Sequence, residues 1–396
     1  MGAEPVSAKI ARVFRRLASH LSDEIAGLGL LYGVMRYRHR PPQRGPTSGA
    51  GFADLVSGDV ARVFGPTPDG VNFAGCSTTL PAAEAARVAG CAEVREFRFP
   101  SSDVTEFEAN NVVRGRLWRS HREDGPRRVV LAMDGVMQAS FGNLRTFARV
   151  CCPAGVDVAT IDLPFNHRRT PEGYRPGQLI LGGDLPHVLS VLRQAVRDTA
   201  AAYRTLRDSG EYPGGVGLAG ISFGGWTALQ TTGLLGSVWK DDATDGPRWV
   251  SGICPAADLL LALTDGGAIV RAARRNLRLS AAQRSALAPV AASVRPDALP
   301  RPVPVDSPTG PHEPPAARVA LHLARYDRFV PNVAVERLAA AWDGELTWHA
   351  TGHMGLAAAP HYLRRVAEPW THDSLWNAAP TRGSGESATD PLSEPA

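Results

Sequence analysis

The sequence predicts an α/β fold in which a mostly parallel sheet is flanked by helices. Between residues 93 and 353, short apolar segments with strand character alternate with amphipathic helical segments, as in strands joined by helical crossovers. The stretch GVGLAGISFGGWTALQ combines a buried strand, a sharp glycine-rich turn and a helix. Polar residues directly follow three of the expected strands, at the sheet edge where open α/β sheets collect their functional sites.

The composition is that of a globular protein with a sizeable core. The chain has 396 residues, of which 44% are hydrophobic and 21% charged, and its net charge is +4. Acidic residues are interspersed among the arginines and no basic stripe with interleaved aromatic residues occurs, so we expect no nucleic-acid partner. The five cysteines have no metal-ligand spacing, and neither a metal nor a cofactor is expected. Free thiols and the lack of a secretory signal indicate the cytoplasm.

Residues 1–90 form the first predicted unit, an N-terminal extension of helix and loops. Apolar residues recur at helical spacing within residues 6–39, which indicates an amphipathic helix. Such a helix packs its apolar face on the main domain or on a dimer partner, or makes a weak contact with a membrane surface. Residues 41–90 are rich in Gly, Pro, Ser and Ala, and we expect loops there with one short helix near 81–89.

Residues 91–378 form the second predicted unit, which carries the sheet. It opens with two segments of alternating apolar and polar residues, typical of half-buried edge strands. The expected strands are 94–101, 110–119, 127–135, 156–164, 216–222, 248–255, 317–327 and 344–349. The expected helices between them include 142–152, 185–208 and 224–235.

Two further segments are predicted from composition. Residues 255–316 contain segments with helical character followed by a Pro-rich stretch, and we expect a helical cap over the site. The same helices could instead belong to the layer that covers the sheet. Residues 379–396 (APTRGSGESATDPLSEPA) are expected to be a disordered tail.

The glycine-rich stretch fits two motifs that share Gly220. Counted from Gly215 it is G-x-G-x-x-G, the dinucleotide-binding pattern, and from Gly220 it is G-x-S-x-G, a nucleophile elbow. The first motif needs a strand before Gly215, where SGEYPG predicts a turn, so we favour the second. Ser222 then lies on the sharp turn. Side chains at Gly220, Gly224 or Gly225 would collide with the neighbouring strand and helix.

A serine nucleophile needs a base, and the base needs an orienting acid. Asp327 ends the strand ARVALHLARYD, and His353 lies in a glycine-flanked loop after GELTWH. The chain order Ser, Asp, His is the one associated with this elbow. Asp258, after an earlier strand, is an alternative acid. His349 lies four residues before His353, but the strand character of ELTWH argues against a metal pair on one helix.

On GISFGG, YDRFVP and GHMG, in this order, the sequence resembles the α/β-hydrolase superfamily in its serine-esterase branch. The resemblance covers about residues 93–370. It implies an α/β-hydrolase fold and a catalytic triad of Ser222, Asp327 and His353.

The resemblance also implies an oxyanion hole. Its donors would be the N–H of Phe223, directly after the nucleophile, and the N–H of Val136 in the loop MDGVMQ. Met137 is the alternative donor in that loop. Many relatives have His-Gly where this chain has Asp134-Gly135, which puts a carboxylate near the hole.

Four residues in loops after the expected strands are expected to contact the substrate: Gly135, Met137, His167 and Met354. The predicted function is a serine hydrolase that cleaves a carboxylic ester of a small molecule through an acyl-enzyme. Thioester cleavage, acyl transfer and peptide hydrolysis are alternatives, because the same triad serves them all. A binding protein that keeps the hydrolase fold without catalysis is the remaining alternative.

Overall fold

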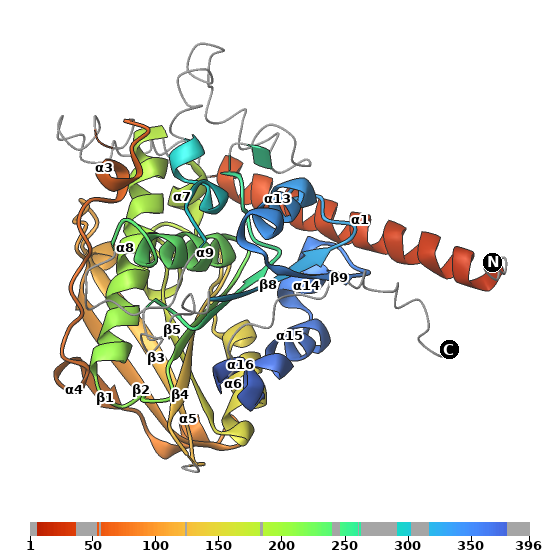
Figure 1. Ribbon diagram of the computed structural model, residues 1–396. Coiled ribbons are helices and arrows are strands. Elements are labelled where there is room, and N and C mark those ends of the chain that lie inside the picture. Colours follow the sequence, from red (N-terminus) through yellow and green to blue (C-terminus); the bar gives the residue numbers. More distant parts are fainter. Residues whose placement is uncertain are drawn as a thin grey trace, which may run out of the picture.

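The computed structural model describes residues 6–36, 54, 57–122, 125–182, 185–239, 246–259, 261–262, 291–301 and 317–377. The centre of the described fold is one sheet with helices on both faces (Figure 1). In chain order its strands are β1 (Ser77–Thr79), β2 (Cys91–Pro100), β3 (Val112–Ser120), β4 (Arg128–Met133), β5 (Val156–Ile161), β6 (Val216–Ile221), β7 (Trp249–Ile253), β8 (Arg318–Ala324) and β9 (Glu345–His349).

The sheet order is β1-β2-β3-β5-β4-β6-β7-β8-β9. The three pairs from β1 to β5 are antiparallel, and every neighbouring pair from β5 to β9 is parallel. The predicted mostly parallel sheet is therefore confirmed. Strand β1 was not expected, because its three residues lie in a segment of the sequence that is rich in turn-forming residues. They become a strand only by pairing with β2, where Ser77 lies opposite Phe97.

Helices cover the sheet on both faces. The described helices are α1 (Val6–Arg36), α3 (Val60–Phe64), α4 (Phe73–Cys76), α5 (Ala82–Ala85), α6 (Gly142–Cys151), α7 (Gln178–Gly182), α8 (Leu185–Asp208), α9 (Phe223–Leu235), α13 (Asn332–Trp342), α14 (His353–Ala358), α15 (Pro360–Ala367) and α16 (Asp373–Asn377). The helices α8, α9 and α13 share one hydrophobic core with the sheet, and α6, α14 and α15 share the other.

Strand β4 shows how one central strand serves both cores. Val129 and Leu131 belong to the core under α8 and α9. Val130 and Ala132 belong to the core under α6 and α15. Successive side chains of a strand point to opposite faces, so a strand buried on both faces is apolar throughout. This explains why the central strands are continuous apolar runs in the sequence.

Residues 57–90 pack on the sheet domain. The indole N–H of Trp239 donates to the carbonyl of Gly65 at 2.7 Å, and Val71 N donates to the hydroxyl of Thr205 at 3.0 Å. The short helix expected near 81–89 is present as α5, but α3 and α4 replace part of the expected loops. The boundary predicted at residue 90 falls between two paired strands of one sheet.

Helix α1 contacts α7 and α14, and its N-terminal end extends past the rest of the described fold (Figure 1). Over residues 11–28, whose side chains the structure describes, the side that faces the body is polar or small and includes Asp23 and Gly27, which are both buried. Large apolar residues on the other side are exposed: Val13, Phe14, Leu17, Leu21, Ile25 and Leu28. The prediction that the apolar face packs on the main domain is wrong. This face stays available for the predicted membrane or dimer contact.

Two predicted segments are described only in part or not at all. Of the predicted cap, 255–316, short pieces at both ends are described, and residues 291–301 lie against α9 and α13. The indole N–H of Trp226 donates to the carbonyl of Val294 at 2.8 Å. The predicted tail, 379–396, lies outside the described residues. In the described part of the chain, no helix combines the length and the apolar character that a membrane crossing requires.

Candidate active site

Ser222 occupies a sharp turn between β6 and α9. Its backbone has φ 53° and ψ −114°, a conformation that residues other than glycine rarely adopt. Two hydrogen bonds hold the turn: Ser222 N donates to the carbonyl of Ile253 on β7 at 2.8 Å, and Trp226 N donates to Ser222 O at 3.0 Å. This strained turn at the carboxyl end of a central strand is the geometry that presents a serine hydroxyl above the sheet.

The glycines around Ser222 are required by close packing of the backbone. A Cβ atom on Gly224 would meet the carbonyl oxygens of Met133 and Asp134 at the end of β4. A Cβ atom on Gly225 would lie 2.9 Å from the oxygen of Gly220, and one on Gly220 would collide with Gly224. The predicted crowding at all three positions is confirmed.

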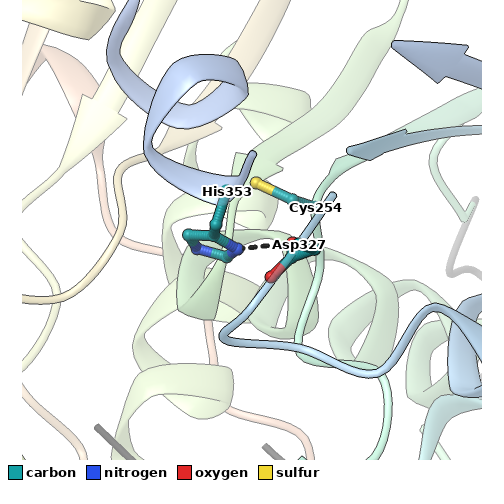
Figure 2. A group of neighbouring side chains, drawn as sticks. All are labelled: Cys254, Asp327 and His353. Carbon is teal, nitrogen blue, oxygen red and sulfur yellow. Dashed lines mark hydrogen bonds and ion pairs between the residues drawn. The ribbon is translucent and has the colours of Figure 1, made fainter. Parts of the chain in front are cut away.

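Ser222, His353 and Asp327 are connected by two hydrogen bonds. The distance from His353 Nε2 to Ser222 Oγ is 3.1 Å, and that from His353 Nδ1 to Asp327 Oδ2 is 2.7 Å. Figure 2 shows the second of these contacts. The other carboxylate oxygen, Asp327 Oδ1, accepts hydrogen bonds from Phe329 N at 2.7 Å and Val330 N at 2.9 Å. The acid is therefore fixed by its own loop and faces the histidine with one oxygen.

The surroundings of His353 favour its protonated form. The imidazole is 3% exposed, and burial alone lowers its pKa. The carboxylate of Asp327 outweighs burial, so the pKa of His353 lies well above its ordinary value. The ring of Phe329 stacks on the imidazole with centroids 4.6 Å apart and planes 15° apart. This contact fixes the ring plane in which both nitrogens make their hydrogen bonds.

The carboxylate of Asp258, the alternative acid, is bound by residues other than His353. Its Oδ2 accepts a hydrogen bond from Arg337 at 2.7 Å, and its Oδ1 accepts one from Leu261 N at 2.8 Å. Arg295 lies 3.8 Å from the same carboxylate. The carboxylate that contacts His353 is that of Asp327.

His349 and His353 do not share a helix. His349 ends β9 and His353 begins α14, as the strand character of ELTWH predicts. The Nε2 atom of His349 lies 3.2 Å from Nδ1 of His322 on β8. Burial lowers the pKa of His322 to about 3 and that of His349 to about 4. The two rings are therefore a neutral pair within the fold at neutral pH.

Cys254 lies beside the histidine and its acid (Figure 2). Among the described residues, Cys254, Asp327 and His353 are the one group of three potential metal ligands, with ligand atoms within 4.8 Å of one another. Burial raises the pKa of the Cys254 thiol, which is 2% exposed. A neutral thiol is a poor metal ligand, and the facing atoms of Asp327 and His353 already bind each other.

The loop after β4 lies next to Ser222. A Cβ atom on Gly135 would be 3.5 Å from Cβ of Ser222. Met137 N donates to Oδ1 of Asn166 at 2.8 Å, so this N–H is already used. Within the described residues, neither Val136 N nor Phe223 N, the two predicted oxyanion donors, donates to the protein.

The carboxylate of Asp134 is buried, and only one of its two oxygens is hydrogen-bonded to described residues. Its Oδ1 accepts hydrogen bonds from Gly135 N at 2.8 Å and from the side chain of Asn143 at 3.0 Å. Burial raises the pKa of Asp134 to about 6. Asp134 therefore closes the start of the loop and bridges it to α6.

The other two predicted substrate contacts are His167 and Met354. His167 N donates to the carbonyl of Gln138 at 3.2 Å, and its ring stacks on Phe141 at 4.8 Å. Asn166, which the sequence analysis missed, is buried and holds Met137. Met354 follows His353 directly and begins α14 with it. The roles of His167 and Met354 toward substrate remain predictions.

Asp23 is a second residue that the sequence analysis missed. It lies on α1, yet its carboxylate accepts hydrogen bonds from His353 N and Met354 N, each at 2.9 Å, and from Arg328 N at 3.2 Å. Nothing in the local sequence separates this aspartate from the other acidic residues. Only the docking of α1 brings it to the loops that carry the acid and the base.

The sheet order and the elbow together define an α/β-hydrolase fold, as the sequence predicts. Between β2 and β9, the sheet begins with the antiparallel strands β2 and β3. Strand β5 then precedes β4 in the sheet, although it follows β4 in the chain. The turn at Ser222 follows β6, and Asp327 and His353 follow β8 and β9. This places all three side chains at the carboxyl ends of parallel strands.

Comparisons with solved structures give similarities of low sequence identity. An esterase from Pyrobaculum calidifontis is 16% identical, with 72% of this chain and 85% of the esterase covered and a TM-score of 0.46. Acetyl xylan esterase 1 from Thermoanaerobacterium sp. JW/SL YS485 is 12% identical, with coverages of 78% and 97% and a TM-score of 0.49. An acylaminoacyl peptidase from Pyrococcus horikoshii is 12% identical, with coverages of 73% and 42% and a TM-score of 0.46. No protein-family model matches the sequence, and no curated protein is similar to it in sequence.

Proposed function

We propose that this protein is a serine hydrolase that cleaves a carboxylic ester of a small molecule through an acyl-enzyme on Ser222. The observation that carries the proposal is the hydrogen-bonded series from Ser222 Oγ to His353 Nε2 and from His353 Nδ1 to Asp327. A strained serine next to a buried histidine with a fixed carboxylate is the arrangement that activates a hydroxyl as a nucleophile.

In the first half-reaction, Ser222 Oγ attacks the acyl carbonyl carbon while His353 Nε2 accepts the hydroxyl proton. Asp327 holds the other ring nitrogen as N–H and stabilises the imidazolium. The oxyanion of the tetrahedral intermediate accepts hydrogen bonds from the N–H groups of Val136 and Phe223. When the C–O bond to the leaving alcohol breaks, His353 returns the proton to the alcohol oxygen, and the acyl group stays on Ser222.

In the second half-reaction, water takes the place of the alcohol. His353 accepts a proton from the water as its oxygen attacks the acyl carbonyl, and the same two N–H groups bind the second oxyanion. Collapse of the intermediate breaks the bond to Ser222 Oγ, which recovers its proton from His353. The products are the free acid and the unchanged enzyme, so no cofactor enters the balance.

The test is labelling with a fluorophosphonate probe together with turnover of short p-nitrophenyl esters. Wild-type protein is expected to be labelled, and Ser222→Ala is expected to lose the label and to lower turnover by a factor on the order of 10⁴ to 10⁶. Ser237→Ala is the matched control, since Ser237 follows α9 at the end opposite to the elbow. Equal labelling of wild type and Ser222→Ala would contradict the proposal.

A panel of substrates decides the acyl class. Oxygen esters are expected to be cleaved faster than acyl-thioesters and aminoacyl amides of the same acyl group. A preference for thioesters or amides would keep the triad mechanism and replace the ester assignment. Specific binding of small acids without any acyl-enzyme would instead favour the non-catalytic alternative.

A further inference from the structure

The docking of α1 places one carboxylate between the two loops that carry the acid and the base. Asp23 is 1% exposed. Its Oδ2 accepts from Arg328 N, next to Asp327, and from His353 N, while its Oδ1 accepts from Met354 N. One rigid side chain therefore binds the backbone of both loops.

The fit around Asp23 is close. A Cβ atom on Gly352, the residue before the histidine, would lie 2.8 Å from Oδ2 of Asp23. Glycine at this position allows the carboxylate to approach the N–H groups of the two following residues. A buried carboxylate is stabilised only when hydrogen bonds replace its hydration, and the three backbone donors supply them.

Neighbouring side chains of α1 make more exposed contacts with the same loop. Glu24 forms an ion pair with Arg328 at 3.1 Å. The ring of His20 makes an edge contact with Tyr326, with centroids 6.3 Å apart. His20, Asp23 and Glu24 are three or four residues apart or adjacent, so they lie on one side of the helix. This side of α1 therefore faces the loop at residues 326–328, and of these three side chains only that of Asp23 is buried.

The charges near His353 come from several elements. Asp327 and Cys254 face the imidazole from the ends of β8 and β7, and Asp23 approaches from α1. Burial raises the pKa of Asp23, and the hydrogen bonds from Met354 N and His353 N counteract this. The Asp23 and His353 charges interact favourably, so ionised Asp23 adds to the effect of Asp327 on the imidazolium.

We propose that Asp23 is a positioning residue of the active site, which holds the Asp327 and His353 loops in register so that both hydrogen bonds of the imidazole form at once. The inference rests on the proposed function of the triad. Helix α1 is then part of the catalytic unit, although it adds no described side chain to either hydrophobic core.

The test compares Asp23→Asn and Asp23→Ala with Glu24→Gln, a control on the same helix that removes only the surface ion pair. Asp23→Asn keeps the size of the side chain but puts an amide N–H₂ against backbone donors. We expect kcat for a short p-nitrophenyl ester to fall about 10- to 100-fold, since a small misplacement of reacting groups costs this much. KM is expected to change less than about threefold, and Glu24→Gln is expected to behave like wild type.

Two readouts separate positioning from a merely structural role. The acid limb of the kcat/KM profile is expected to move to lower pH in Asp23→Asn, because a negative charge near the imidazolium is lost. Added formate is expected to restore part of the rate of Asp23→Ala by filling the carboxylate position. A third readout needs no turnover: the low-field proton resonance of His353 Nδ1–H is expected to shift in Asp23→Asn and not in Glu24→Gln.

The outcomes distinguish the two proposals. If wild type is not labelled by fluorophosphonate, the proposed function fails, and the proton resonance alone decides on Asp23. If wild type is labelled and folded Asp23→Asn keeps its kcat, its pH profile and its proton resonance, the positioning role is wrong. Loss of cooperative unfolding in Asp23→Asn at wild-type pH and temperature would assign Asp23 to folding and would also overturn the inference.

Discussion

At the scale of single residues, the chemistry depends on which groups face each other. Asp258 and Asp327 both follow parallel strands, and each has its carboxylate bound by a specific partner. Asp327 contacts His353, whereas Asp258 contacts Arg337. Arg337 and Leu261 N hold the Asp258 carboxylate away from His353, whereas one oxygen of Asp327 faces the imidazole. The strand positions alone left both acids open, and side-chain contacts decide between them.

Exchange of the two acids for amides tests this difference. Asp327→Asn is expected to lower kcat by about 10⁴-fold, because the amide favours the wrong tautomer of His353. Asp258→Asn is expected to leave kcat within about twofold of wild type, since it lies outside the hydrogen-bonded series. Rates with a p-nitrophenyl ester and the melting temperatures of both variants are the measurements. A larger rate loss in Asp258→Asn than in Asp327→Asn would reverse the assignment.

The raised pKa of His353 predicts the acid side of the activity profile. The base must be neutral to accept the proton of Ser222, so kcat/KM should fall tenfold per pH unit below the His353 pKa. Because this pKa is raised, the limb is expected above the ordinary histidine value of about 6.5. In Asp327→Asn the remaining activity is expected to show the limb at lower pH. An acid limb of wild type below pH 6 would contradict the electrostatics of the site.

At the scale of elements, the site depends on the contact between two tight turns, the elbow at Ser222 and the loop after β4. The elbow between β6 and α9 packs against the end of β4, where the loop with the proposed oxyanion donors begins. The sequence predicted the crowding, since small residues surround Ser222. The sequence did not decide between Val136 N and Met137 N as oxyanion donors. That choice depends on Asn166, 29 residues further along the chain, which accepts a hydrogen bond from Met137 N.

An alanine at the elbow should disturb both turns together. Gly224→Ala is expected to reduce the free energy of unfolding by about 1–3 kcal/mol, as overpacking does, because its Cβ meets carbonyl oxygens of β4 and the following loop. It is also expected to lower the rate of fluorophosphonate labelling. The control is Gly142→Ala at the start of α6, where the nearest atom to the new Cβ is Ser140 Oγ at 3.6 Å. Equal unfolding free energies of the two variants in urea would contradict the crowding.

At the scale of the whole molecule, α1 reverses the usual arrangement of an amphipathic helix. Over residues 11–28, its polar side faces the body and its large apolar residues face outward, with Phe14 68% exposed. The periodicity predicted the helix correctly. It could not predict which side docks, because burial of the Asp23 carboxylate is favourable only where three backbone donors already converge.

The neutral histidine pair between β8 and β9 predicts a dependence of stability on pH. The folded pKa of His322 is about 3, below the unfolded value of about 6.5, so the unfolded chain binds more protons and stability is lost as pH falls below about 6.5. Asp134 and Asp157, with pKa values raised to about 6, act in the opposite direction. The contribution of the histidine is therefore measured as a difference between variants.

His322→Gln is expected to be less stable than wild type at pH 7, because it loses the contact with His349. The difference in unfolding free energy is expected to shrink by about 2 kcal/mol at pH 5. The reason is that only the wild type must keep the imidazole of His322 neutral in the folded state, where the unfolded chain is protonated. Urea unfolding at the two pH values is the measurement, and His372→Gln, at an exposed histidine, is the control. A pH-independent deficit of His322→Gln would mean that folding does not lower the pKa of His322.

The sequence by itself determined the alternation of strands and helices, the elbow at Ser222 and the residue types of the site, because these depend on periodicity and on contacts between near neighbours. Tertiary structure alone decided that Asp327 faces His353, that Met137 N is occupied and that Asp23 supports both loops. Asp23 and His353 are 330 residues apart, and no local pattern encodes such a contact. It exists because helix docking and strand order bring a buried carboxylate within hydrogen-bond distance of three backbone N–H groups.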